Sequence, residues 1–304
     1  MNLRINWSDE NYGEIAHNIY RSTTTMDPAS LPTPLATLGS NVITYLDETV
    51  VDQTTYFYIV SAVLDGVEYL SDEFDEFIDS SVGVIPTDGL IIYFDFESIS
   101  GSTVPNESPT AGVLDGTKGA GVTAVSGSLD AIAGNFNGST SGYIDVAHSS
   151  DFDSSDYSVS MWVKVIPDSS DTTGLIWKAP NTGFSRQMSF SVESSNDSSR
   201  FNMGMSTGST LYNLQSTTTV NNTWQHVVAI QEGRVGKIYV NGDLEATLTA
   251  NADLITNTEK LTFGRVTSAS SSGRYLEGQM DSVRVYNRAL TQSEVTSLSN
   301  EFVT

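Results

Sequence analysis

The segment 278–295 constrains the fold more than any other part of the chain, because it joins an alternating strand to a capped helix. Its strand is marked by apolar or aromatic residues at Met280, Val283, Val285 and Tyr286. Thr291 with Glu294 three positions later has the spacing of a capping box, and Leu290 and Val295 have that of a hydrophobic staple. The sequence therefore predicts a strand that runs into a short helix with Thr291 as its N-cap.

The composition favours two globular units in a chain of 304 residues with 38% hydrophobic content. A net charge of −23, from 14 Lys and Arg against 37 Asp and Glu, disfavours nucleic acid and anionic membrane as partners. The absence of cysteine excludes disulfides, thiol catalysis and cysteine-ligated zinc. A metal would therefore depend on the three histidines or on oxygen ligands, which suit calcium.

The N-terminal sequence lacks the apolar core of a signal peptide, and no run of about 18 apolar residues occurs anywhere. We therefore expect a chain that is made in soluble form in the cytoplasm and is not inserted into a membrane.

Residues 1–80 are predicted to form a small β sandwich, because short β-type runs recur there at regular spacing. Four segments resemble strands C to F of a fibronectin type III domain: Asn18-Ile-Tyr-Arg-Ser, Leu35-Ala-Thr-Leu, Tyr45-Leu-Asp-Glu-Thr and Thr55-Tyr-Phe-Tyr-Ile-Val-Ser-Ala-Val. Trp7 then corresponds to the core tryptophan of strand B. The resemblance leaves no residues for strand A, so either a neighbouring chain covers that edge or the module is a variant without the strand.

Residues 81–87 are predicted to be a linker, because the sequence changes there from acidic to small and extended. The first 87 residues hold 14 acidic and 2 basic side chains, a net charge of −12, so the first module has a strongly acidic surface.

Residues 88–304 are predicted to form an antiparallel two-sheet sandwich. Its β-type runs are separated by Ser, Thr, Gly and Asn clusters, and no helical periodicity occurs before residue 291. Asn241-Gly242 is predicted to form a type I′ hairpin turn, because both residues tolerate positive φ.

Several motifs of this region, in the right order, resemble the laminin-G-like, concanavalin A-like jelly-roll family. They are Leu90-Ile-Ile-Tyr-Phe-Asp-Phe-Glu, Asn135-Phe-Asn-Gly-Ser-Thr-Ser-Gly-Tyr-Ile-Asp-Val, Tyr157-Ser-Val-Ser-Met-Trp-Val-Lys, Thr223-Trp-Gln-His-Val-Val-Ala, Lys237-Ile-Tyr-Val-Asn-Gly and the closing segment 278–295. The two resemblances imply an all-β protein: a fibronectin III-like sandwich, then a concanavalin A-like antiparallel jelly roll with one short C-terminal helix.

A structural calcium ion is expected from the same resemblance, where the first and last strands of the jelly roll meet. Asp95, Asn106 and Asp281 match the positions implied for its ligands, and backbone carbonyls and water would complete the shell. The alternative is that Asp95 and Asp281 are solvated strand residues. It is favoured by Glu107, which stands where relatives have a shorter aspartate.

Catalysis is not expected. Retaining β-glucanases of the superfamily carry two glutamates and an aspartate on alternate residues of one strand, and no such strand occurs here. His226, in the motif Trp224-Gln-His, is interpreted as a packed, hydrogen-bonded residue.

A ligand-binding surface is predicted instead, because saccharide sites combine an aromatic ring with amides and charged groups on loops. The candidates in or beside predicted loops are Trp177, Arg186, Tyr212 and Asn213.

The expected function is a non-catalytic structural or adhesion protein on the surface of a virus particle, such as a bacteriophage decoration, fibre or tail component. Its expected partners are capsid or tail proteins of the same particle and a host cell-surface glycan, in a homo-oligomer or multi-copy assembly. The alternatives are a bacterial extracellular carbohydrate-binding or adhesion module and, third, a glycan-cleaving enzyme. Fold alone does not decide among them.

Overall fold

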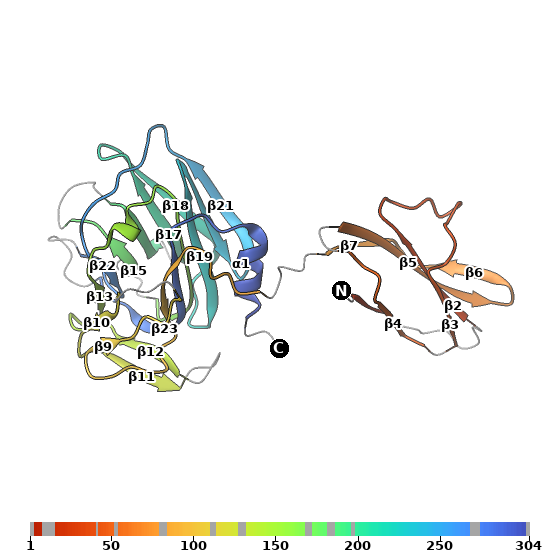
Figure 1. Ribbon diagram of the computed structural model, residues 1–304, viewed down its shortest axis with the longest axis horizontal. Coiled ribbons are helices and arrows are strands. Elements are labelled where there is room, and N and C mark those ends of the chain that lie inside the picture. The colour runs from red at the N-terminus through yellow and green to blue at the C-terminus, as the bar shows by residue number, and fades with distance from the viewer. Residues whose placement is uncertain are drawn as a thin grey trace. The chain divides into compact units, whose positions relative to one another are not determined.

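The structure, a computed structural model, divides into two compact units, Met1–Val82 and Gly83–Thr304 (Figure 1). It describes residues 3–7, 16–40, 42–51, 54–78, 84–109, 114–126, 132–167, 172–180, 186–195, 198–267 and 274–301. Residues 81–83 of the predicted linker lie outside these ranges.

The first unit is built from two β sheets. Its strands are β1 (Leu3–Asn6), β2 (Ala16–Ser22), β3 (Ala36–Gly39), β4 (Thr44–Asp47), β5 (Thr54–Leu64), β6 (Val67–Leu70) and β7 (Phe74–Ile78). One sheet pairs β1 with β4, and the other has the order β3-β2-β5-β6, with β7 also paired to β5. Ile5, Ile19, Tyr58 and Val60 are buried in the core, and Trp7 packs against it. Among the described residues β1 pairs with β4 alone, and the fibronectin III resemblance of this unit stays a prediction.

The second unit is a sandwich of two antiparallel sheets, here called sheet I and sheet II. Sheet I has the order β18-β17-β16-β15-β22-β13-β10-β9. Its strands are β9 (Thr103–Val104), β10 (Gly116–Lys118), β13 (Ile144–Val146), β15 (Thr173–Lys178), β16 (Met188–Ser195), β17 (Ser198–Ser206), β18 (Leu211–Thr219) and β22 (Leu261–Phe263).

Sheet II has the order β11-β12-β23-β14-β19-β20-β21, with β8 also paired to β23. Its strands are β8 (Leu90–Phe94), β11 (Val122–Ser126), β12 (Ile132–Asn137), β14 (Tyr157–Val165), β19 (Gln225–Glu232), β20 (Val235–Val240), β21 (Asp243–Thr249) and β23 (Glu277–Tyr286). A 3-10 turn, η1 (Ser150–Phe152), and helix α1 (Gln292–Ser299) complete the unit.

The main core lies between the two sheets, where one side of each strand presents apolar residues. In sheet I these include Ile176, Phe190 and Met203, and in sheet II they include Val163 and Val283. A period of two places alternate side chains on opposite faces of a strand, so the outer face of each sheet carries the residues between them.

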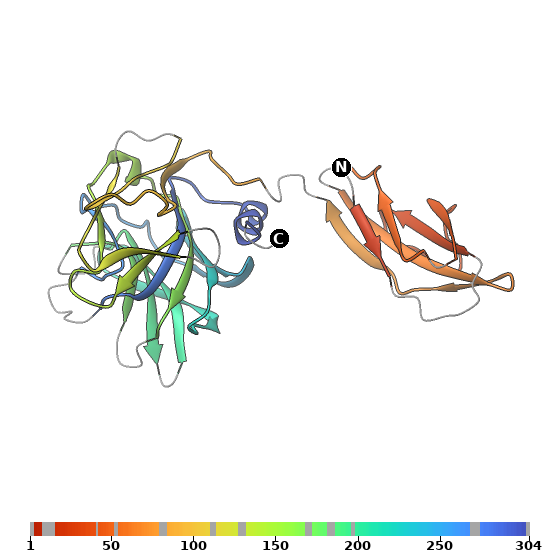
Figure 2. The ribbon, with the colours of Figure 1, turned by 90° about the horizontal axis from the view of Figure 1, so that it is seen from below.

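Helix α1 packs on the outer face of sheet II, beside β19 (Figures 1 and 2). A second apolar cluster lies beneath it and contains Leu90, Val228, Ile230, Tyr239, Tyr286, Leu290, Val295 and Leu298. Thr291 is the N-cap, and its side chain accepts a hydrogen bond from the Glu294 backbone N–H while Glu294 accepts one from the Thr291 N–H. The predicted capping box is confirmed.

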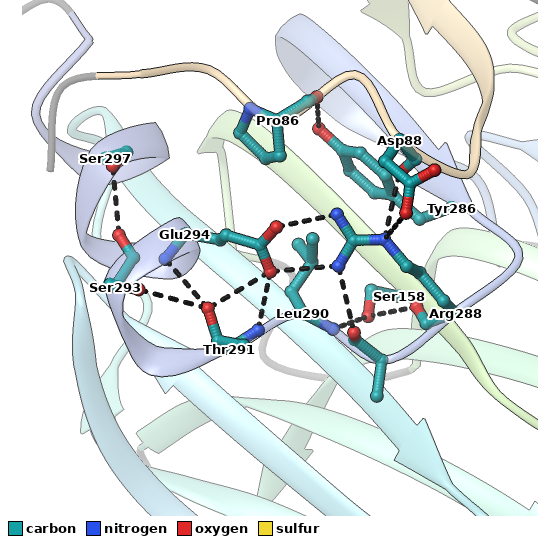
Figure 3. A network of polar contacts seen from close by, with 11 residues as sticks. Pro86, Asp88, Ser158, Tyr286, Arg288, Leu290, Thr291, Ser293, Glu294 and Ser297 are labelled. Atoms are coloured by element: carbon teal, nitrogen blue, oxygen red, sulfur yellow. Dashed lines mark hydrogen bonds and ion pairs between the residues drawn. The ribbon is translucent and has the colours of Figure 1, made fainter. Parts of the chain in front are cut away.

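Polar contacts join the N-terminal segment of this unit to its C-terminal segment (Figure 3). Arg288 makes a bidentate pair with Glu294, with an N–O distance of 2.6 Å, and donates to the Asp88 carbonyl oxygen at 2.9 Å. The Tyr286 hydroxyl donates to the Pro86 carbonyl oxygen at 3.1 Å. Burial alone would raise the pKa of Glu294, but hydrogen bonds from Arg288 and Thr291 lower it below its usual value.

The all-β class, the paired antiparallel sheets and the single C-terminal α-helix are confirmed. The Asn241-Gly242 turn is confirmed too, with φ of 52° and 91°. The sequence missed several strands, of which β18 matters most for the site.

Candidate functional site

The register of sheet I places one row of residues toward the core. Ile176 lies opposite Phe190, Phe190 opposite Met203, and Met203 opposite Leu214. All four side chains belong to the main core. Residues directly opposite one another in an antiparallel pair share a face, so the neighbouring row must point away from the core.

That neighbouring row is Trp177, Ser189, Gly204 and Asn213, on β15, β16, β17 and β18. It continues through Thr262 to Asp145 in the other half of the sheet. Gly204 has no room for a side chain, because a Cβ there would collide with the Ser189 hydroxyl. The outer face of sheet I is therefore lined by small and polar groups beside one tryptophan.

A second outward row runs parallel to the first and contains Ser191, Asn202 and Gln215. Asn202 is 2% exposed, and its Nδ2 atom has no hydrogen-bond partner among the described residues. A buried amide nitrogen without a partner costs roughly 1–3 kcal/mol. Such a group calls for an explanation, and a bound ligand or water is one.

Trp177 lies on β15, in the middle of sheet I, and is 4% exposed. Ala179 and Val266 pack against it, and the Arg186 guanidinium lies 4.7 Å from its ring centre. Burial lowers the pKa of Arg186 and nearby Arg274 lowers it further, while Glu193 opposes both. Like Asn202, Trp177 has an unpartnered buried donor, its Nε1 atom, among the described residues. Trp177 and Arg186 thus belong to the same face as Asn213.

Asp145, farther along the first row, is part of an ion-pair cluster. Its carboxylate accepts hydrogen bonds from Lys260 at 2.5 Å, Thr262 at 2.9 Å and Arg265 at 3.0 Å. The Arg265 guanidinium also lies 3.6 Å from the Tyr143 ring centre. This carboxylate is committed to structural contacts.

The placement predicted for Tyr212 and Asn213 is wrong, because both lie within β18 and not in a loop. The strand was missed because its sequence is rich in Ser and Thr, which are also common in turns. Alternation puts the two side chains on opposite faces, so that Tyr212 packs against the core and Asn213 is exposed. The Tyr212 hydroxyl accepts a hydrogen bond from the Asn251 backbone N–H at 3.3 Å. The four candidates therefore do not form one cluster.

Sequence reasoning also missed Asn202, Ser189 and Ser191. Each is an ordinary polar residue in an alternating strand, and only the register of four strands shows that they share a face.

The three residues predicted as calcium ligands have different environments. Asn106 Oδ1 accepts hydrogen bonds from the backbone N–H groups of Tyr93 and Ser108, at 2.9 and 3.1 Å, and Nδ2 donates to the Ile91 carbonyl oxygen. Its amide oxygen is therefore already used, and Asn106 does not fit the role of a metal ligand.

Asp95 Oδ1 accepts from the Glu97 N–H at 3.0 Å, and Asp281 is 1% exposed and accepts from the Ser282 N–H at 2.7 Å. The described residues contain no group of three or more His, Cys, Asp or Glu side chains placed to share a metal. The calcium site stays a prediction that this geometry does not favour.

His226 is 1% exposed, and its Nε2 lies 2.9 Å from the Ser160 hydroxyl oxygen. Burial, aided by Arg284, lowers its pKa to about 3, so the imidazole is neutral in the folded protein. Ser160 is itself fully buried, so this pair is inaccessible to a substrate.

In the described part of the chain, no helix has the length and apolar character to span a bilayer.

Comparison with solved structures shows the same fold in several glycan-related proteins. Domain 4 of AbnA, an extracellular arabinanase from Geobacillus stearothermophilus in complex with arabinotriose, matches with 21% identity and a TM-score of 0.54 over 70% of this chain and 100% of that domain. A Trypanosoma rangeli sialidase in complex with sialic acid matches with 15% identity and a TM-score of 0.54, over 82% of this chain and 43% of the sialidase.

The botulinum neurotoxin serotype C1 binding domain matches with 13% identity and a TM-score of 0.51, over 70% of this chain and 52% of that structure. The chain thus spans less than half of the sialidase and about half of the toxin fragment. These identities are low enough that the likenesses show the fold alone.

A comparison with curated protein sequences gives no match. The sequence profile of the Concanavalin A-like lectin/glucanases superfamily matches residues 137–296. This span includes β14 to β23 and most of α1, and it covers more than half of the chain. The chain therefore belongs to the concanavalin A-like lectin/glucanase superfamily.

Proposed function

We propose that the second unit binds glycan without cleaving it, on the outer face of sheet I. The observation that carries the proposal is the buried Asn202 amide, which lies unpartnered among the described residues in a row with Ser191 and Gln215. Sugar hydroxyls both donate and accept hydrogen bonds, and so do serine hydroxyls and carboxamides. The Asn202 nitrogen has almost no exposed surface, so it marks the floor of this face, and the exposed carboxamides of Asn213 and Gln215 beside it are suited to the hydroxyl groups of a ligand.

Arg186 and Trp177 add a charged and an aromatic group beside these polar rows. Because Arg186 already covers the Trp177 ring, the ring supports the guanidinium and the guanidinium meets the ligand. The arabinotriose complex of the arabinanase domain supports a saccharide as the class of ligand.

A non-catalytic role is supported by the carboxylates of this face. Glycoside hydrolysis uses two carboxyl groups roughly 5–9.5 Å apart. Asp145 is held by its ion pairs, and it lies three strands away from Glu193 in the order of sheet I, at least roughly 14 Å at about 4.8 Å per strand. The two acids are therefore too far apart to act on one glycosidic bond.

The setting we propose is the surface of a virus particle, where the protein serves as a decoration, fibre or tail component and contacts capsid or tail proteins of the same particle. A cysteine-free, strongly acidic chain with two β units supports this role, because it needs no oxidising compartment to fold and a high net charge keeps it soluble. The alternative is a bacterial extracellular adhesion module. Light scattering of the purified chain separates them, since a particle component is expected in multiple copies and an adhesion module as a monomer.

The test of glycan binding is an array of neutral and acidic glycans probed with the full chain, in calcium and in EDTA. Asn202→Leu, which keeps the branched shape of the side chain but replaces the amide with two methyl groups, is expected to weaken binding to the array. Asn251→Leu, at an exposed position outside the two rows, is the matched control and should bind normally. Equal binding by both variants, or no binding by the native chain, would refute the proposed site.

A further inference from the structure

A hollow of about 400 Å³ lies on the other sheet, where β12, β23 and β14 run side by side. Its size falls within the range of about 300–1,000 Å³ that small-molecule sites occupy. It is lined by Asn135, Phe136, Asn137, Lys164, Ile166, Asn222, Glu277, Gly278 and Gln279.

The register shows that the hollow opens on the outer face of sheet II. Asn135 lies opposite Gln279, and Gln279 opposite Lys164. The adjacent residues Phe136 and Val165 point into the main core, so this row points outward. Gly278 stands between Phe136 and Val165 in the row that faces the core, and it lines the hollow with its backbone alone. The floor is therefore bare backbone with polar groups on either side.

Five of the six polar side chains that line the hollow are not used by the fold, while Asn137 accepts hydrogen bonds from Ser139. Asn135, Lys164, Asn222, Glu277 and Gln279 make no side-chain hydrogen bond or ion pair with any described residue. Surface amides are often solvated singly, but here three amides, one ammonium and one carboxylate converge on the same space. Convergent polar groups around a preformed hollow are the usual form of a ligand site.

The chemistry of the lining selects a class of ligand. Carboxamides donate and accept, and the Lys164 and Glu277 charges cancel, so the hollow has no net preference for an ion. Ile166, which is 43% exposed, adds an apolar wall for C–H groups. We propose that this hollow is a second binding site for an uncharged, polyhydroxylated ligand, namely a neutral saccharide unit.

This second site lies on the opposite side of the sandwich from Asn202, since one faces outward from sheet II and the other from sheet I. The two cannot contact the same sugar ring. A protein with both sites would bind two saccharide units at once, and its overall affinity for a dense glycan layer would exceed that of either site.

The test is saturation-transfer NMR on the full chain with the methyl glycosides of glucose, galactose, arabinose and N-acetylglucosamine, and with methyl glucuronide as the anionic probe. The double variant Asn135→Ala/Gln279→Ala removes two amides from the floor. Asn222→Trp fills the hollow from a loop without changing a strand, so it stays informative if the double variant does not fold. Thr123→Ala, next to Asn135 in the same row but outside the hollow, is the matched control.

We expect at least one neutral glycoside to bind the native chain, Asn202→Leu and Thr123→Ala alike, and to bind both hollow variants roughly tenfold more weakly or not at all. Absence of neutral glycoside binding, unchanged binding by the hollow variants, or a preference for the glucuronide would overturn the inference. Binding lost in Asn202→Leu but kept in the hollow variants would leave the proposed function standing and this site refuted. The reverse pattern would support this site and refute the one on sheet I.

Discussion

The outer face of sheet II is apolar where α1 covers it, whereas the outer face of sheet I is built from Ser, Asn, Gly and Gln. Val228 and Ile230 belong to one apolar cluster with Leu298 on the covered face, and the buried Ser158 hydroxyl beside it is hydrogen-bonded to the Leu290 N–H and the Arg288 carbonyl oxygen. On the open face Asn202 is buried without a partner in the described part of the chain. The covered face has such atoms too, among them His226 Nδ1, but a large apolar cluster stabilises it, whereas the described part of the open face has only the small cluster of Trp177, Ala179 and Val266.

The difference follows from what each face excludes from water. Burying apolar surface stabilises a fold by about 25 cal/mol per Å², while an unpaired buried amide opposes folding. A face that gives up stability in this way is the better place to look for a binding role.

The largest expected effect comes from weakening the contact between α1 and sheet II. Leu298→Ala removes a fully buried side chain from α1 and is expected to lower the free energy of unfolding by about 2–5 kcal/mol. Leu211→Ala makes the same chemical change on the outer face of sheet I, where the side chain is only half-buried, and should cost less than about 1.5 kcal/mol. Urea unfolding of the full chain measures both, and equal losses would contradict the contrast between the faces.

The second-largest effect is expected at acid pH, where protonation of His226 on the outer face of sheet II should lower the free energy of unfolding. His226 is neutral when folded because its pKa is lowered to about 3, whereas the unfolded chain takes up a proton near pH 6.5. Stability is therefore full above about pH 6.5 and falls by about 1.4 kcal/mol per pH unit toward pH 3, on the order of 3 kcal/mol at pH 4. Melting curves of His226→Gln should be flatter over this range, and His148→Gln, at a partly exposed position, should follow the native chain. Parallel curves for all three proteins would exclude His226 as the cause.

The edge of sheet II provides the third contrast, and it also tests the calcium prediction. If Asn106 holds the free edge of β8, Asn106→Ala should lower the free energy of unfolding by about 1–3 kcal/mol, equally in calcium and in EDTA. Asn106→Asp keeps two oxygens for a metal but loses the amide donor to Ile91, so it should be destabilised as well. A calcium-dependent rise in the melting temperature of the aspartate variant would restore the metal hypothesis.

The smallest expected effect has the opposite sign. Asn202→Leu removes the unpartnered amide from the open face and should raise the free energy of unfolding by about 1 kcal/mol, while it weakens glycan binding. Thermal melting and array binding on the same sample measure both. A variant that loses stability would show that the amide has a partner and that the face carries no penalty.

Strands with a strong alternating or apolar pattern were predictable from the sequence. The segments 55–63 and 157–164 were recognised by their sequence motifs and lie within β5 and β14, because β-branched and aromatic residues are frequent in them. The capped helix was predictable because its signal is local, with Thr291 and Glu294 only three residues apart.

The site was harder to predict, because its residues meet only through strand register. Asn202 and Gln215 share a face only because β17 and β18 pair as they do, and no local pattern in the sequence encodes that pairing. The burial of Trp177 was not predicted for a related reason. Trp177 lies near the end of a strand, and Val266, which packs against it, comes from a distant part of the chain.

Strand β23 is the last strand in the sequence but stands inside sheet II, with β14 on one side and β12 and β8 on the other. During synthesis, residues 90–94 must wait until residues 277–286 have left the ribosome before they find their pairing partner. Contacts this distant in sequence slow folding, and they expose unpaired strands meanwhile. A ribosome that stalls before residues 277–286 would therefore release a chain whose second sheet lacks the strand that joins β8, β12 and β14.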